Sequence, residues 1–329
     1  MTSNEAIDRR RWLGATAAGM VGASLGGSAF AWDPPGGGSG SAPIRDLDEA
    51  EVEKGLGEAG VAPIRRLRSN HYLALGDAAE SFLRSTLTDC ERLLIAYERH
   101  FRARGFDVKP PDRPLLVTAF ADDRSFGKYH KLPSLMQGGA QAVGTYDRAT
   151  NLLSVFDWRN VPQVDRAANR NVQTVSHEGT HQLTFNTGLL DRGADVPVCV
   201  VEGLGTYGEP RKVIGPSDLG RMNVQRVDDL AKLRRSFSWI PVAALLSDDS
   251  ILRAGLYGRV QLAYAESWAL IHMLLNDEAR LPGCRDYLAA LKTRKTAEHR
   301  LDDARTHLGD LDRLDRDLQA RAVRLARAL

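Results

Sequence analysis

Two histidines and a glutamate at helical spacing are the residues in this sequence best suited to chemistry. His177 and His181 are four residues apart, and Glu178 directly follows the first histidine. Residues four apart share one face of a helix, so both imidazoles can reach one metal ion. Zinc binds histidine nitrogens at about 2.0–2.1 Å and lowers the pKa of bound water toward about 7. The spacing therefore predicts a zinc site in which Glu178 takes a proton from that water as general base.

A catalytic zinc site needs a third protein ligand and keeps a further position open. Metzincins use a later histidine, but Thr184 and Thr187 stand at the corresponding positions here, which excludes that class. Gluzincins use a glutamate on a following helix. Glu202 lies 25 residues after His177, far enough for one helix to end and a second to return. Glu202 is therefore the first candidate for the third ligand.

Two other acidic residues stay open as the third ligand. Asp191 lies in the expected loop between the two helices, and Glu209 follows the second helix. Gly208 and Pro210 flank Glu209, so it should lie beyond the end of that helix. Both remain alternatives to Glu202.

The elements that must position these residues follow from hydrophobic periodicity. Strands are expected at 66–75, 114–120, 141–146 and 151–158, the last two forming a hairpin around 147–150. Helices are expected at 77–104, 122–131, 165–187, 198–207, 241–246, 257–276 and 281–293, with a short one possible within 45–58. Strands mixed with helices come first and helices alone follow, which predicts an α+β fold.

The charged stretch 297–329 carries leucines at helical spacing: Leu308, Leu311, Leu314 and Leu318. One interpretation is a coiled coil that binds a partner. The favoured interpretation is a solvated helix that packs one apolar stripe on its own domain.

The first residues have the features of an export signal. Arg9, Arg10 and Arg11 precede Trp12 and Leu13, as in a twin-arginine signal. A weakly apolar run follows at 14–30 and ends at a small-x-small cleavage site, Ala29–Ala31. Residues 1–31 are therefore expected to be a signal peptide of an exported, periplasmic or extracellular protein, with an uncleaved membrane anchor as the alternative. Residues 32–62 are expected to be a flexible linker or N-terminal extension, because 34–41 is rich in proline, glycine and serine.

The composition of the chain limits which classes of binding partner are expected. The 44 basic and 42 acidic residues give a net charge of +2, which provides no reason to expect a nucleic acid or an anionic membrane surface. No segment after the N-terminal run is apolar enough to span a membrane, so no stable membrane association is expected after signal cleavage. The three cysteines, Cys90, Cys199 and Cys284, form no disulfide framework and are expected to be buried, although one disulfide is possible after export.

With these residues in place, the chain resembles the peptidase MA-like gluzincins. It looks closest to an uncharacterised domain-of-unknown-function family of predicted bacterial zinc peptidases. The resemblance rests on Thr174–Leu183 (TVSHEGTHQL), on Pro197 with Val201–Tyr207 (VEGLGTY), on Tyr264–Leu270 (YAESWAL) and on the hairpin near Gly144–Tyr146. It covers the chain roughly from Arg66 onward. Gly205 departs from the usual alanine, and Cys199–Val201 replaces a usual large apolar residue.

The resemblance implies a zincin-like domain over 63–329, with an α/β lobe at about 63–190 and a helical lobe at about 191–329. It implies a small mixed sheet above the helix with the two histidines. In gluzincins a downstream tyrosine often hydrogen-bonds the oxyanion, which makes Tyr264 the candidate and His272 an alternative donor. The implied partner is a peptide or protein substrate, expected to lie along an edge strand of the hairpin at 141–158.

Two other functions stay open. One is a non-catalytic binding protein on a zincin scaffold, although a purely structural metal site has no need of Glu178. The other is a zinc amidase that acts on cell-wall peptide. The sequence leaves the substrate and the oligomeric state open.

Overall fold

The computed structural model describes residues 43–132, 144–162, 167–209 and 219–328. The expected signal peptide and the proline- and glycine-rich stretch at 34–41 lie outside these residues, as do the first three residues of the strand expected at 141–146. No helix in the described ranges is both long enough and apolar enough to cross a membrane.

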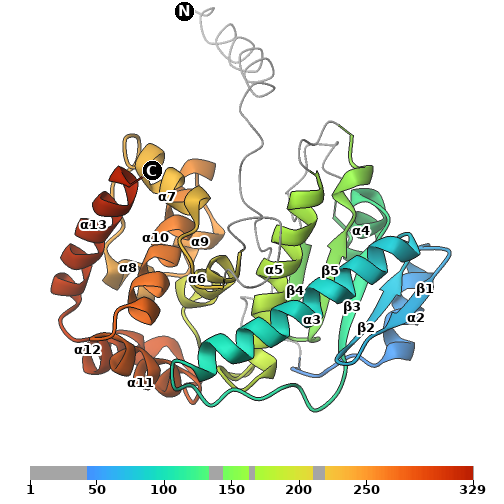
Figure 1. Cartoon of the computed structure of the whole chain (residues 1–329), viewed down its shortest axis with the longest axis horizontal. Helices are drawn as coiled ribbons and strands as arrows, with labels where there is room; N and C mark the ends of the chain where they lie inside the picture. The colour runs from blue at the N-terminus through green and yellow to red at the C-terminus, as the bar shows by residue number, and fades with distance from the viewer. Residues whose placement is uncertain (1–42, 133–143, 163–166, 210–218, 329) are drawn as a thin grey trace, which may run out of the picture.

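A five-stranded mixed sheet forms one half of the molecule (Figure 1). Its strands, in spatial order, are β1 (Arg65–Arg68), β2 (Tyr72–Gly76), β3 (Leu115–Phe120), β5 (Leu152–Phe156) and β4 (Gly144–Asp147). The central pairs β2–β3 and β3–β5 are parallel, and the outer pairs are antiparallel. The α+β class is therefore confirmed, and β4 forms the hairpin expected with β5 and lies at an edge of the sheet.

The single strand expected at 66–75 is wrong. The chain makes two antiparallel strands there, β1 and β2, which pair Arg66 with Leu75. Between them the backbone N–H of Ser69 donates to the carbonyl of Tyr72 at 2.9 Å. The turn lies at Ser69 and Asn70, which are usual turn residues, so turn chemistry rather than hydrophobic periodicity indicates it.

Helices cover both faces of the sheet. The long helix α3 (Glu80–Arg102) and α5 (Ala167–Asn186) share one core with Ala74 and Val117. The helices α2 (Glu49–Glu58) and α4 (Asp123–His130) share a second core with Leu75. Successive strand residues point to opposite faces, so β2 is buried throughout because both faces are covered.

The helix α2 lies in the segment expected to be a linker or extension. Asp48 and Glu51 form a capping box at its start, which satisfies backbone N–H groups that the helix itself leaves unpaired. Val52 and Leu56 are buried against the sheet. The short helix that the sequence allowed at 45–58 is therefore formed and packed.

The second half of the molecule is helical (Figure 1). It contains α6 (Val198–Gly208), α7 (Val224–Leu233), α8 (Val242–Ser247), α9 (Ser250–Arg253), α10 (Tyr257–Asn276), α11 (Leu281–Leu291), α12 (Arg300–Leu308) and α13 (Leu311–Arg327). The helix α10 is buried along nearly its whole length and packs against α6 and α7. The helices α7 and α9 were not expected, although Val227 and Leu230 of α7 are buried at helical spacing; α9 has a single turn.

The stretch at 297–329 packs on its own chain. Leu311, Leu314, Leu318 and Ala322 of α13 are buried, while its other face is charged. Leu311, Leu314 and Leu318 therefore form the stripe that the favoured interpretation expected, whereas Leu308 lies on the separate helix α12 and is partly buried. The three cysteines are free and buried, as expected.

The helix α3 joins the two halves. Its C-terminal end reaches under the helical half in Figure 1, where His100 Nε2 lies 2.8 Å from the hydroxyl of Tyr207 on α6. Nearby, Nε of Arg104 donates to the carbonyl of Leu275 on α10 at 3.0 Å. These contacts fix α6 and α10 relative to the sheet.

Candidate metal centre

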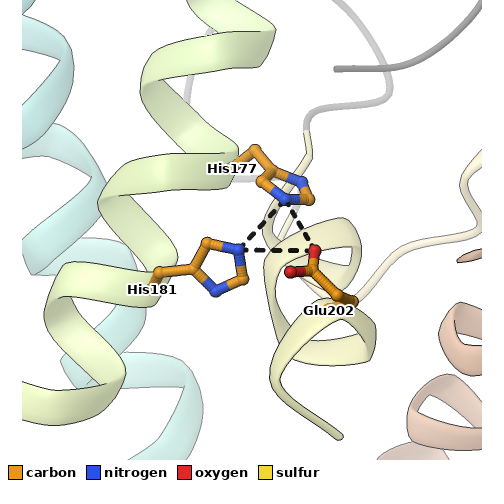
Figure 2. A group of neighbouring side chains, drawn as sticks. All are labelled: His177, His181 and Glu202. Carbon is orange, nitrogen blue, oxygen red and sulfur yellow. Dashed lines mark hydrogen bonds and ion pairs between the residues drawn. The ribbon is translucent and has the colours of Figure 1, made fainter. Parts of the chain in front are cut away.

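Three side chains converge between the sheet and the helical half. His177 and His181 come from one face of α5, and Glu202 comes from α6 (Figure 2). All three are buried, and their ligand atoms lie within 4.8 Å of one another. The structure therefore brings together the three residues that the sequence placed first.

The distances suit a small four-coordinate ion. Nε2 of His177 lies 3.1 Å from Nε2 of His181 and 3.2 Å from Oε2 of Glu202, and the third side of the triangle is 3.6 Å. A tetrahedral site with bonds of about 2.0–2.1 Å has ligands about 3.3 Å apart. The residues present could therefore hold a metal ion.

The electrostatics also favour a cation at this point. Nδ1 of His177 lies 3.0 Å from Oε1 of Glu209, which keeps a proton on Nδ1, and Nε2 lies 3.2 Å from Oε2 of Glu202. Burial lowers the pKa of His177, but hydrogen bonds to Glu202 and Glu209 outweigh it and raise the pKa to about 10. Burial raises the pKa of Glu202, but the charge of His181 and the hydrogen bond to His177 bring it to about 2. The cluster therefore stabilises positive charge among its three ligand atoms.

The two alternative ligands lie elsewhere. Glu209 contacts the other nitrogen of His177 and is itself held by Arg226 Nη2 and Asn223 Nδ2, each at 2.7 Å. Asp191 is half exposed and pairs with Lys295. Glu209 therefore orients a ligand, and Asp191 is not part of the cluster.

Two glycines let α6 approach α5 closely. A Cβ atom at Gly205 would lie 2.6 Å from Cε1 of His181 and 3.0 Å from Cε1 of His177. A Cβ at Gly208 would lie 1.9 Å from Oγ1 of Thr180. Gly205 therefore makes room for both imidazoles. The sequence showed that glycine stands here in place of the usual alanine, but it did not indicate this packing role.

Glu178 is fully buried, and its carboxylate interacts with the backbone N–H of Tyr146 on β4. Burial raises its pKa, and the charges of His177 and His181 offset part of that effect. It lies against the edge strand β4, because a Cβ atom at Gly144 would be 3.2 Å from its Cγ. This carboxylate is thus placed between the histidines and the sheet edge.

Tyr264 on α10 reaches the same cluster. Burial raises the pKa of Tyr264 well above its usual value, and the negative charge of Glu202 raises it further. The hydroxyl of Tyr264 also donates a hydrogen bond to Glu202. The guanidinium carbon of Arg226 lies 5.6 Å from its ring centre. His272, the alternative donor, instead contacts Arg321 and packs on Trp268.

Arg226 and Asn223 were not anticipated. Asn223 caps α7 by accepting the backbone N–H of Arg226, and the Arg226 side chain is fully buried beside Glu209. An asparagine before a helix is a usual cap, but nothing in the sequence distinguishes a buried arginine from a surface one.

Residues 171–296 match a family model described as a protein of unknown function, DUF1570. The matched region contains His177, His181, Glu202 and Tyr264. The chain is thus similar to an uncharacterised family over the region that builds the centre. No curated protein matches the chain.

Proposed function

We propose that this protein is an exported zinc-dependent peptidase of the gluzincin type with a zincin-like domain. The observation that carries the proposal is the buried triangle of His177, His181 and Glu202 with the buried carboxylate of Glu178 beside it. A metal site that serves only structure has no use for that carboxylate, whereas hydrolysis needs a base there.

The three ligands supply two imidazole nitrogens and one carboxylate oxygen, a donor set that catalytic zinc uses. A zinc ion held there would polarise a carbonyl group and make water more acidic. Glu209 keeps the proton of His177 on Nδ1, so that Nε2 offers its lone pair to the ion.

Glu178 is the proposed general base. Its carboxylate accepts from the backbone N–H of Tyr146 and keeps acceptor capacity for a hydrogen bond from a water molecule. Burial weakens its acidity, which makes the carboxylate a better proton acceptor. It takes a proton from the attacking water and then delivers that proton to the leaving amine.

The strand β4 is the proposed docking site for the substrate backbone. It lies at the edge of the sheet next to Glu178, and an extended peptide can pair with such an edge. Tyr264 is the proposed oxyanion donor, because its raised pKa keeps the hydroxyl protonated next to Glu202.

The test combines metal analysis with proteolysis. Purified protein should contain one zinc ion per chain and cleave a casein or peptide-library substrate. Glu178→Gln should keep the zinc and lose activity by about a hundredfold or more, since a general base contributes roughly 10²–10⁴-fold. Gln319→Leu on α13, far along the chain from the cluster, is the control and should keep full activity. Protein that cannot be loaded with metal, or a Glu178→Gln variant as active as the wild type, would refute the proposal.

A further inference from the structure

A stripe of three side chains on α10 leads from the surface to the metal centre. Tyr257, Gln261 and Tyr264 are spaced by four and three residues, so they lie on one face of the helix. Tyr257 is 55% exposed, Gln261 4% and Tyr264 2%. At a rise of about 1.5 Å per residue, the stripe is roughly 10 Å long. It runs from the solvent-exposed Tyr257 to Tyr264, which lies next to Glu202.

The helix α7 faces this stripe. Arg226 lies over the ring of Tyr264 at its inner end. At the outer end, burial raises the pKa of Tyr257, the charge of Asp229 adds to that effect and the charge of Arg226 opposes it. Gln261 stands one turn from each tyrosine on the same face of α10, the spacing that places it at the packing boundary of α10 with α7.

Polar atoms without partners gather along the boundary. Both polar side-chain atoms of Gln261, two guanidinium nitrogens of Arg226 and one oxygen of Asp229 are buried and make no hydrogen bond within the described residues. The contact between Arg226 Nη1 and Asp229 Oδ2 is 3.9 Å, too long for a hydrogen bond. Most buried polar groups in proteins are paired, so a cluster of unpaired donors and acceptors indicates a place built for a polar group.

The charges indicate what kind of group fits. Glu209 and Asp229 already balance the positive charge of Arg226, so an added anion would meet no excess positive charge. The unpaired atoms include both donors, on Arg226 and Gln261, and acceptors, on Asp229 and Gln261. An uncharged amide, with one carbonyl and one N–H group, complements both.

We propose that Gln261, with Arg226 and Asp229, forms a subsite that binds an amide group of the substrate beside the metal centre. The proposal rests on the proposed function and adds a substrate class to it. The amide can come from the substrate backbone or from an asparagine or glutamine side chain, and the experiments below separate these sources.

The first experiment does not depend on catalysis. Crystals of the zinc-loaded Glu178→Gln protein are soaked with acetamide or, separately, with acetate. The expected result is acetamide density within hydrogen-bond distance of Gln261 and Arg226, with no acetate at the same place. Ordered water only, or acetate in preference to acetamide, would overturn the subsite even if the protein cleaves no peptide.

The second experiment compares cleavage of a peptide library by the wild type, Gln261→Leu and the control Gln319→Leu. A side-chain source predicts a preference for Asn or Gln at one position, lost by about tenfold or more in Gln261→Leu. A backbone source predicts a similar loss for all sequences and a matching loss when that peptide bond is replaced by an ester. Unchanged kcat/KM and preference in a folded, zinc-loaded Gln261→Leu would overturn the subsite and leave the peptidase proposal standing.

Discussion

Oε1 of Glu209 lies 3.0 Å from Nδ1 of His177 and also accepts a hydrogen bond from Arg226 at 2.7 Å. One carboxylate oxygen thus joins a metal-ligand candidate on α5 to an arginine on α7. Burial raises the pKa of Glu209, but the charge of Arg226 and the hydrogen bond to His177 lower it to about 2. The carboxylate is therefore ionised and able to hold the imidazole in one orientation.

The first prediction concerns this contact. Glu209→Gln should weaken metal binding by about 10–100-fold, the usual effect of losing a carboxylate that orients a ligand histidine. The measurement is a competition titration with a chromophoric chelator. Glu98→Gln, which removes a carboxylate paired with Arg102 on α3, is the control and should bind metal like the wild type. Equal affinities for both variants would show that Glu209 does not position His177.

The second prediction separates two of the acidic candidates for the metal ligand, Glu202 and Asp191. Glu202→Gln should lower the bound metal from about one ion per chain to a small fraction, since catalytic zinc depends on three protein ligands. Asp191→Asn should leave the metal content unchanged, because Asp191 pairs with Lys295 outside the cluster. Elemental analysis of dialysed protein gives the answer. A fully loaded Glu202→Gln protein would contradict the assignment.

The third prediction concerns the packing of α6 on α5. Gly205→Ala places a Cβ 2.6 Å from Cε1 of His181, so the imidazole must move. Metal affinity should fall while the fold is retained, because the displaced atom ends a side chain. Gly57→Ala is the matched control, since a Cβ there meets nothing within 4 Å. Chelator competition and circular dichroism check both variants, and wild-type affinity in Gly205→Ala would show that the imidazole has room to spare.

The fourth prediction concerns Glu266, a fully buried carboxyl group on α10 that accepts the backbone N–H of Ile240 at 3.1 Å. Burial raises the pKa of Glu266 to about 9. The hydrogen bond from Ile240 and the positive charges of Arg259 and Arg234 oppose this rise, and the negative charge of Asp315 adds to the rise. The unfolded carboxyl titrates near about 4.3. The folded state therefore holds a proton that the unfolded state loses, and stability falls as pH rises between about 4.3 and 9.

Glu266→Gln removes this titration. Relative to the variant, the wild type should lose up to about 1.4 kcal/mol of unfolding free energy per pH unit between pH 6 and 8. Urea unfolding at several pH values measures the difference. Glu58→Gln, an exposed change, should give a curve parallel to that of the wild type. Parallel curves for the wild type and Glu266→Gln would contradict the prediction.

Much of the centre could be predicted because its ligands are close in sequence. The spacing of His177 and His181 places both on one face of a helix. Glu202 lies on the next helix along the chain, which packs directly against the first. The residues around the ligands could not be predicted in this way. Arg226 comes from a helix whose apolar residues Val227 and Leu230 are buried, and its own burial depends on the pairing with Glu209.

The same distinction holds for the fold. Strands β3 and β5 have continuous apolar runs, so their existence and approximate bounds follow from the sequence. The turn between β1 and β2 lies at Ser69 and Asn70, where turn residues carry a signal that hydrophobic periodicity does not. The order of the strands and the contact of α3 with α6 are tertiary properties that no local pattern carries.

The short separation of the three ligands also bears on how the chain folds. The closure entropy of a loop grows only with the logarithm of its length, and Glu202 is 25 residues from His177. The helical hairpin of α5 and α6 can therefore assemble from local contacts, before distant segments such as α10 are in place. We expect hydrogen exchange during refolding to protect α5 and α6 early, so that a metal ion could meet its ligands on a partly folded chain.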